Sequence, residues 1–123
     1  ETTRRILEGH PKVALISPVD YPVFTQLMKR AVLILSDSGG IQEEAPALGV
    51  PVLVIRDHTD RPEAIEVGAA KLVGTDRAAI LEAAVHLLAD EAARCEMTLG
   101  GSPYGDGRAS QRIVSALLSG RLD

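Results

Sequence analysis

The chain has 123 residues, of which 46% are hydrophobic and 24% charged, a balance typical of one folded domain. Aromatic residues make up only 2%, and 17 acidic residues against 13 basic ones give a net charge of −4. These values argue against nucleic-acid binding, which needs a basic surface and stacking aromatics. The single cysteine excludes an internal disulfide framework and fits the reducing cytoplasm. No apolar run approaches the ~20 residues that span a bilayer, so we expect neither membrane contact nor a secretory leader.

Four short apolar runs, rich in β-branched residues, predict strands at 13–16, 32–35, 52–55 and, more weakly, 71–73. Near-continuous apolar strands are typical of parallel sheets that are covered on both faces. Helical patterns lie between these runs, at 20–30, 39–48 and 61–67. This alternation predicts an α/β fold, with a Rossmann-like parallel sheet flanked by helices.

The C-terminal third of the chain carries only helical patterns. A helix begins at Asp76, and its buried stripe is expected at Ile80, Ala84, Leu87 and Leu88. Further helices are expected at 90–99 and 108–118, separated by a glycine-rich loop.

Residues that start and stop helices support these boundaries. Asp20 is an N-cap candidate, and Pro22 fits the first helical turn that follows. Gly49 follows a helix as a terminator, and Gly68 and Gly74 end the next helix and strand. Residues 1–7 read like the middle of a helix, so we expect one domain, residues 1–123, truncated at its N-terminus.

The glycine turn after the second predicted strand is the most informative stretch of the sequence. Ser38 is a good N-cap, and Gly39 and Gly40 allow another molecule to approach the backbone closely. The free N–H groups at the start of this helix favour an anion such as a phosphate or diphosphate. Glu44 follows one helical turn later, where a carboxylate can accept hydrogen bonds from a ribose diol. The alternative is a capped helix with a tight turn and no ligand.

Two further candidates lie in neighbouring loops. Arg61 follows the third strand, where its planar guanidinium can pair with a phosphate. Alternatively, Arg61 pairs with a nearby carboxylate: Asp57, Asp60 or Glu63. Phe24 follows the first strand and is either the wall of a base-binding site or a core residue.

Five sequence blocks carry a resemblance to a known family. They are residues 37–46 (DSGGIQEEAP), 48–54 (LGVPVLV), 61–64 (RPEA), 72–76 (LVGTD) and 103–107 (PYGDG). Together they resemble the non-hydrolysing UDP-N-acetylglucosamine 2-epimerases, and the match runs over nearly the whole chain. The first block is shared with many nucleotide-sugar glycosyltransferases, whereas RPEA and PYGDG are more specific. His58 departs from the family pattern, which often has threonine at that position.

The resemblance implies a two-domain enzyme of the glycosyltransferase-B type, with UDP-sugar bound between the domains, of which this chain is the nucleotide-binding one. By family pattern, the UDP-binding residues are Phe24 beside uracil, Ser38, Gly39 and Gly40 at the diphosphate, Glu44 at the ribose and Arg61 at the nucleotide. The family interconverts UDP-GlcNAc and UDP-ManNAc by eliminating and re-adding UDP, with inversion at C2, in cell-surface polysaccharide biosynthesis. It uses no metal or other cofactor. Its catalytic carboxylates lie in the missing N-terminal domain, so no catalytic residue is expected in this chain.

The resemblance also implies a homodimer in the full-length protein and two further strands before residue 1. The usual doubly wound order places those strands in the sheet between segments 12–17 and 32–36. Without those strands, the two segments must pair directly, pair with another chain, or leave exposed edges. The sequence alone leaves two alternatives to the epimerase assignment. The chain could be the donor-binding domain of a nucleotide-sugar glycosyltransferase, or a non-catalytic nucleotide-binding module.

Overall fold

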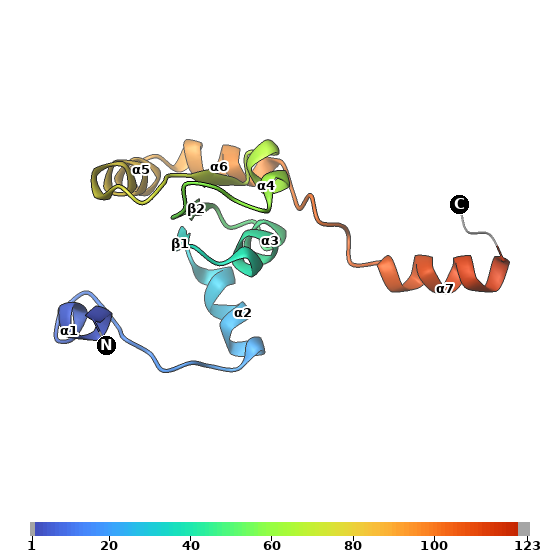
Figure 1. Ribbon diagram of the computed structural model, residues 1–123, viewed down its shortest axis with the longest axis horizontal. Helices are drawn as coiled ribbons and strands as arrows, with labels where there is room; N and C mark the ends of the chain where they lie inside the picture. The colour runs from blue at the N-terminus through green and yellow to red at the C-terminus, as the bar shows by residue number, and fades with distance from the viewer. Residues whose placement is uncertain (1, 121–123) are drawn as a thin grey trace.

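The computed structural model describes residues 2–120, which form a small parallel sheet with helices on both faces (Figure 1). In chain order the elements are α1 (Thr2–Leu7), α2 (Tyr21–Arg30), β1 (Ile34–Ser36), α3 (Gly39–Ala47), β2 (Val52–Val54), α4 (Pro62–Glu66), β3 (Ala70–Leu72), α5 (Arg77–Ala89), α6 (Glu91–Leu99) and α7 (Ala109–Ser119).

The three strands are parallel and lie in the order β1-β2-β3, with Ile34 opposite Val52 and Val52 opposite Ala70. The central strand β2 is completely buried. This burial explains why residues 52–55 show no polar alternation. The predicted α/β class with a parallel sheet is therefore confirmed, and each of these strands lies within two residues of its expected position.

Two apolar cores lie on opposite faces of the sheet. Val52 and Val54 belong to a core with Ile41 and Ala45 of α3 and Ala64 of α4. Leu53 points to the other face, where Ala83 and Leu87 of α5 are buried beside it. Successive side chains of a strand alternate between faces, so three residues of β2 anchor both layers. On α5, Leu88 is 59% exposed, so its expected place in the buried stripe was wrong.

Aspartate side chains cap the N-termini of three of the described helices. Asp20 accepts a hydrogen bond from the Val23 N–H at 3.3 Å, as predicted for α2. Asp76 and Asp90 cap α5 and α6 in the same way, at 2.9 and 3.0 Å. These caps satisfy N–H groups that have no partner within the helix, which fixes where each helix begins.

The strand predicted at 13–16 is wrong. This segment is an exposed, extended connection between α1 and α2, and it runs well away from the sheet (Figure 1). An isolated extended segment has no neighbour for its backbone N–H and C=O groups, so its apolar sequence does not make it a strand. Among the described residues no strand pairs with the outer edge of β1.

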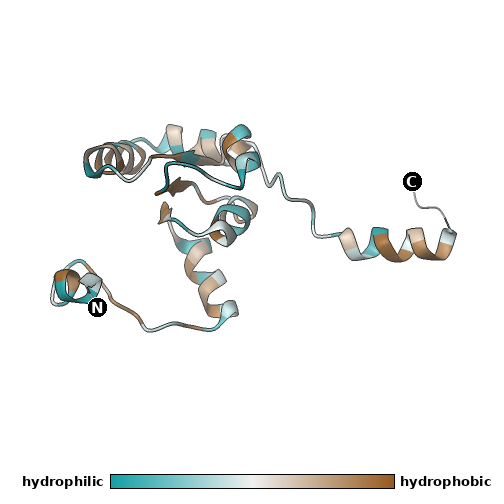
Figure 2. Cartoon of the chain, viewed as in Figure 1, coloured by the Kyte–Doolittle hydropathy of each residue, from teal (hydrophilic) through white to brown (hydrophobic). Residues whose placement is uncertain are grey.

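Hydrophobic residues also gather on α7, which projects from the opposite side of the body to α1 (Figure 2). Leu117 and Leu118 are 69% and 84% exposed. The chain therefore carries apolar surface at both ends of its described part, outside the two cores.

Candidate functional site

Three loops meet at the carboxyl edge of the sheet because the strands are parallel. Ile55 N donates to the Ser36 carbonyl, Val73 N to the Val54 carbonyl and Gly74 N to the Arg56 carbonyl, each at 3.0 Å. In open α/β sheets, ligands bind at this edge. The structure therefore brings the glycine turn and the loop that carries Arg61 to the same side of the sheet.

Gly74 shows how closely these loops approach. Its φ of +69° lies in the left-handed region, and a Cβ added there would lie 3.2 Å from Asp57 Oδ1. A side chain at position 74 would therefore strain the backbone and crowd the loop after β2.

The glycine turn opens α3, with Ser38 at the N-cap position as predicted. The Ser38 N–H donates to Ser36 Oγ at 3.1 Å, which fixes the turn after β1. Within the described part of the chain, however, the Ser38 hydroxyl makes no capping hydrogen bond. That hydroxyl is exposed at the helix start and available to a ligand.

Gly39 and Gly40 are not required by the fold itself. Both lie within α3, and neither has a positive φ. A Cβ added to Gly39 meets nothing within 4 Å, and one added to Gly40 lies 3.9 Å from both Ser38 Oγ and Glu44 Oε1. Glycine costs about 1 kcal/mol relative to alanine in a helix. The two glycines therefore leave open space at the positive end of α3 that no side chain of the described residues fills. We call this space, beside Gly39 and Gly40, the cradle.

Glu44 is on the same side of α3 as this cradle, as its 3.9 Å separation from a Gly40 Cβ indicates. Its other carboxylate oxygen, Oε2, accepts a hydrogen bond from the Tyr21 hydroxyl at 2.9 Å. This bond brings the first turn of α2 beside α3. Phe24 lies one turn further along α2 and is 38% exposed, so it is not a core residue. Sequence reasoning missed Tyr21, although it precedes Pro22 at a helix start and shares the loop with Phe24.

Arg61 is held by two carboxylates, those of Glu43 and Asp60. Its Nε donates to Glu43, and its Nη1 donates to the Asp60 carbonyl at 3.0 Å and to Asp60 Oδ2 at 3.1 Å. The hydrogen bond to Glu43 and the charge of Asp60 raise the pKa of Arg61 above its ordinary value. Of the carboxylate partners considered from sequence, the structure selects Asp60 and adds Glu43 from α3. The Arg61 side chain remains 39% exposed, so it is open to a further anion.

The loop before α7 packs on the side of α4. The Tyr104 hydroxyl accepts a hydrogen bond from the Ala64 N–H at 3.3 Å, and burial raises the pKa of Tyr104. Beyond it, Asp106 pairs with Arg112 through two hydrogen bonds of 2.8 Å. The PYGDG block therefore holds the loop to α4 and to the first turn of α7.

The chain forms an α/β domain with a parallel sheet covered on both faces, and its structural neighbours, which include a UDP-N-acetylglucosamine 2-epimerase from Listeria monocytogenes with a TM-score of 0.89, assign this domain to the glycosyltransferase-B type. The family model described as UDP-N-acetylglucosamine 2-epimerase matches residues 1–118. The chain belongs to the UDP-N-acetylglucosamine 2-epimerase family.

Individual relatives agree with this assignment. The UDP-N-acetylglucosamine 2-epimerase of Yersinia pestis is 56% identical over 95% of this chain, and that of Escherichia coli K12 is 54% identical over 99%. The UDP-GlcNAc 2-epimerase of Neisseria meningitidis bound to UDP-GlcNAc is 46% identical, with a TM-score of 0.86 over 94% of this chain and 32% of that one. The S. aureus MnaA–UDP structure is 44% identical, with a TM-score of 0.87 over 94% of this chain and 32% of that one. The chain spans about a third of the curated relatives' length, 31% and 32%.

Between residues 2 and 120, every helix is too short or too polar to cross a membrane.

Proposed function

We propose that this chain is the UDP-binding domain of a UDP-N-acetylglucosamine 2-epimerase. The full-length protein interconverts UDP-GlcNAc and UDP-ManNAc by eliminating and re-adding UDP, with inversion at C2. Family membership supports this proposal, and so do similar structures that contain UDP or UDP-GlcNAc. The observation that carries it is the open cradle at Gly39 and Gly40, where the fold would accept alanine.

The diphosphate occupies this cradle in the proposed complex. Backbone N–H groups of the first turn of α3 and the Ser38 hydroxyl donate to phosphate oxygens, and the helix dipole favours their negative charge. Arg61 adds a fixed positive charge from the loop after β2. Because Glu43 and Asp60 already hold its Nε and Nη1, Arg61 is positioned before the ligand arrives.

Glu44 binds the ribose. One of its oxygens accepts from Tyr21, while the other faces Gly40 and is available to a ribose hydroxyl. Phe24 borders the uracil. Its exposed ring lies on the same helix as Tyr21, near the start of α2.

The chemical role of this domain is to stabilise the leaving group. As the bond from the sugar to UDP breaks, negative charge grows on the diphosphate oxygen, and the α3 N-terminus and Arg61 stabilise that charge. The acid and base that move the C2 proton lie in another domain of the full-length protein, within hydrogen-bond reach of the sugar.

We also propose that this protein is a cytoplasmic homodimer.

The test is turnover by the full-length protein that contains this chain, followed by NMR of the nucleotide sugar. Conversion of UDP-GlcNAc to UDP-ManNAc is expected. Transfer of the sugar to an acceptor would instead identify a glycosyltransferase. UDP binding without turnover of either kind would identify a non-catalytic module and would overturn the epimerase assignment.

A further inference from the structure

Gln42 is the fully buried polar side chain of the described residues, with a relative exposure of 0%. It lies at the end of the first turn of α3, between the buried residues Ile41 and Ala45. A buried amide must have its donors and acceptor satisfied, because an unpaired polar group is costly away from water. The partners that Gln42 uses therefore reveal what it holds in place.

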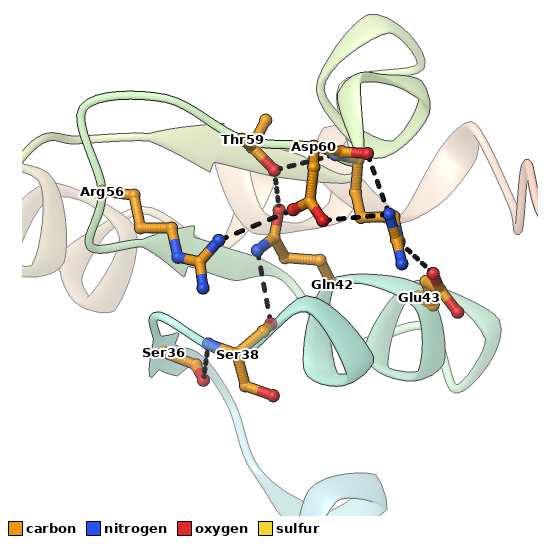
Figure 3. Close-up of polar contacts among 8 residues, drawn as sticks. Ser36, Ser38, Gln42, Glu43, Arg56, Thr59 and Asp60 are labelled. Atoms are coloured by element: carbon orange, nitrogen blue, oxygen red, sulfur yellow. Dashed lines mark hydrogen bonds and ion pairs between the residues drawn. The ribbon is translucent and has the colours of Figure 1, made fainter.

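Gln42 joins two loops that follow different strands (Figure 3). Its Nε2 donates to the Ser38 carbonyl at 3.3 Å, and its Oε1 accepts from the Thr59 hydroxyl at 2.5 Å. The same Thr59 oxygen accepts the Arg61 N–H at 3.0 Å. A continuous chain of hydrogen bonds thus runs from the glycine turn through Gln42 to the backbone of Arg61.

The direction of each bond in this chain is fixed by chemistry. The Ser38 carbonyl can only accept, so it faces the amide nitrogen and turns the amide oxygen toward Thr59. Thr59 already accepts from Arg61, so its own proton is available to Gln42. An ionised glutamate at position 42 could not donate to Ser38, and a methionine could neither donate nor accept as an amide does.

We propose that Gln42 is a positioning residue that sets the diphosphate-binding turn at the correct separation from Arg61, so that both engage one UDP molecule. This inference rests on the proposed function and deepens it. Gln42 itself is buried and acts on UDP only through Ser38 and, by way of Thr59, through Arg61.

The first test measures the UDP affinity of the full-length protein that contains this chain, by calorimetry. Gln42→Met and Thr59→Val each break the hydrogen bond that joins these two residues in the middle of the chain. Each is expected to weaken UDP binding about tenfold, the scale of one lost buried hydrogen bond. The double variant is expected to lose little more than either single variant, because the second change removes a bond that is already broken. Gln111→Met, on the exposed face of α7, is the matched control and keeps wild-type affinity.

The second test is rescue by protonation. In the Gln42→Glu variant, a protonated carboxyl can donate to Ser38 and accept from Thr59, whereas the ionised form cannot. The ratio of its UDP dissociation constant to the wild-type value should therefore fall as the pH falls. The same ratio for Gln42→Met should stay flat, which separates positioning from a general loss of packing.

Two results would overturn the inference. One is wild-type UDP affinity in folded Gln42→Met and Thr59→Val variants, with circular dichroism as the check of folding. The other is full additivity of the two losses. If the wild-type protein binds no UDP, the proposed function fails, and amide hydrogen exchange still decides whether Gln42 links the glycine turn to Arg61. Faster exchange at the residue 42 amide, which bonds to the Ser38 carbonyl, and at the Arg61 amide in Gln42→Met supports the link, and unchanged exchange at both refutes it.

Discussion

The fold would accept alanine at position 40, so the proposed ligand, and not the packing of the protein, accounts for glycine there. The Gly40 backbone is helical, and the space beside it is bounded only by Ser38 Oγ and Glu44 Oε1 at 3.9 Å. The sequence predicted this turn, Glu44 and the position of Arg61, because each is adjacent to a strand or helix end. It did not predict Glu43 as the partner of Arg61, nor Gln42 and Tyr21. These contacts join residues 17 to 23 positions apart and depend on how the loops pack.

Replacing Gly40 with alanine should leave the fold intact and impair binding. We expect the free energy of unfolding to stay unchanged or rise by up to about 1 kcal/mol, because alanine is the better helix residue. We expect UDP affinity to fall at least about tenfold, because the methyl group fills the cradle. Urea denaturation and calorimetry measure the two quantities. Ala78→Ser, which adds one heavy atom at the equivalent position of α5, is the control and should leave UDP affinity unchanged.

Glu44→Ala tests the proposed ribose contact. Loss of a charged hydrogen-bond acceptor should weaken UDP binding by roughly tenfold or more, while binding of inorganic diphosphate should change little. Calorimetry with the two ligands separates these effects. Glu66→Ala removes an exposed carboxylate from α4 and controls for net charge. Equal UDP affinity in the Glu44→Ala and Glu66→Ala variants would refute the ribose assignment.

At the scale of elements, local sequence signals located the helices that carry caps and the strands that are buried. Asp20 and Gly49 marked the expected boundaries, and β2 is apolar because both of its faces are covered. The same apolar signal failed at 13–16, since hydrophobicity does not specify whether a neighbouring strand is present. The segment is equally apolar whether it pairs or not, so pairing was not predictable from it.

Asp76→Ala should remove the cap of α5. We expect about 1 kcal/mol of lost stability, because the Ala79 N–H loses its acceptor. Urea denaturation measures the loss. Asp76→Asn keeps an acceptor oxygen and should cost only a few tenths of a kcal/mol. Equal losses in the two variants would contradict the capping role.

The link between Asp106 and Arg112 should respond to acid. The hydrogen bond from Arg112, with a second from the Arg108 N–H, lowers the pKa of Asp106. A carboxylate whose pKa is lowered by folding contributes its stability above the pKa of the unfolded chain, and this contribution is lost as the pH falls through the folded pKa. An NMR titration should therefore find the Asp106 pKa below the ordinary value of about 3.9 and find it raised in Arg112→Gln. An unchanged pKa in that variant would refute the link.

The whole molecule has a well-covered central strand but much open apolar surface. Leu35 on β1 is 43% exposed and Leu117 on α7 is 69% exposed, and no described strand pairs with the outer edge of β1. Exposed strand edges and apolar patches favour association.

We expect the 123-residue chain to self-associate as its concentration rises, and sedimentation velocity should detect this. Leu35→Lys and Leu117→Lys should each reduce association by placing a charge in an apolar contact. Lys29→Glu, on the exposed surface of α2, serves as a control for a charge change outside these patches. A wild-type chain that stays monomeric at all concentrations would contradict the prediction.

The most direct test of the central claim, that the carboxyl edge of this sheet binds UDP, is calorimetric titration of the chain with UDP, uridine and inorganic diphosphate. The account predicts saturable binding of one UDP per chain, and weaker binding of uridine and of diphosphate, because each lacks half of the contacts. A folded chain that gives no heat with UDP, or that binds uridine as tightly as UDP, would contradict it.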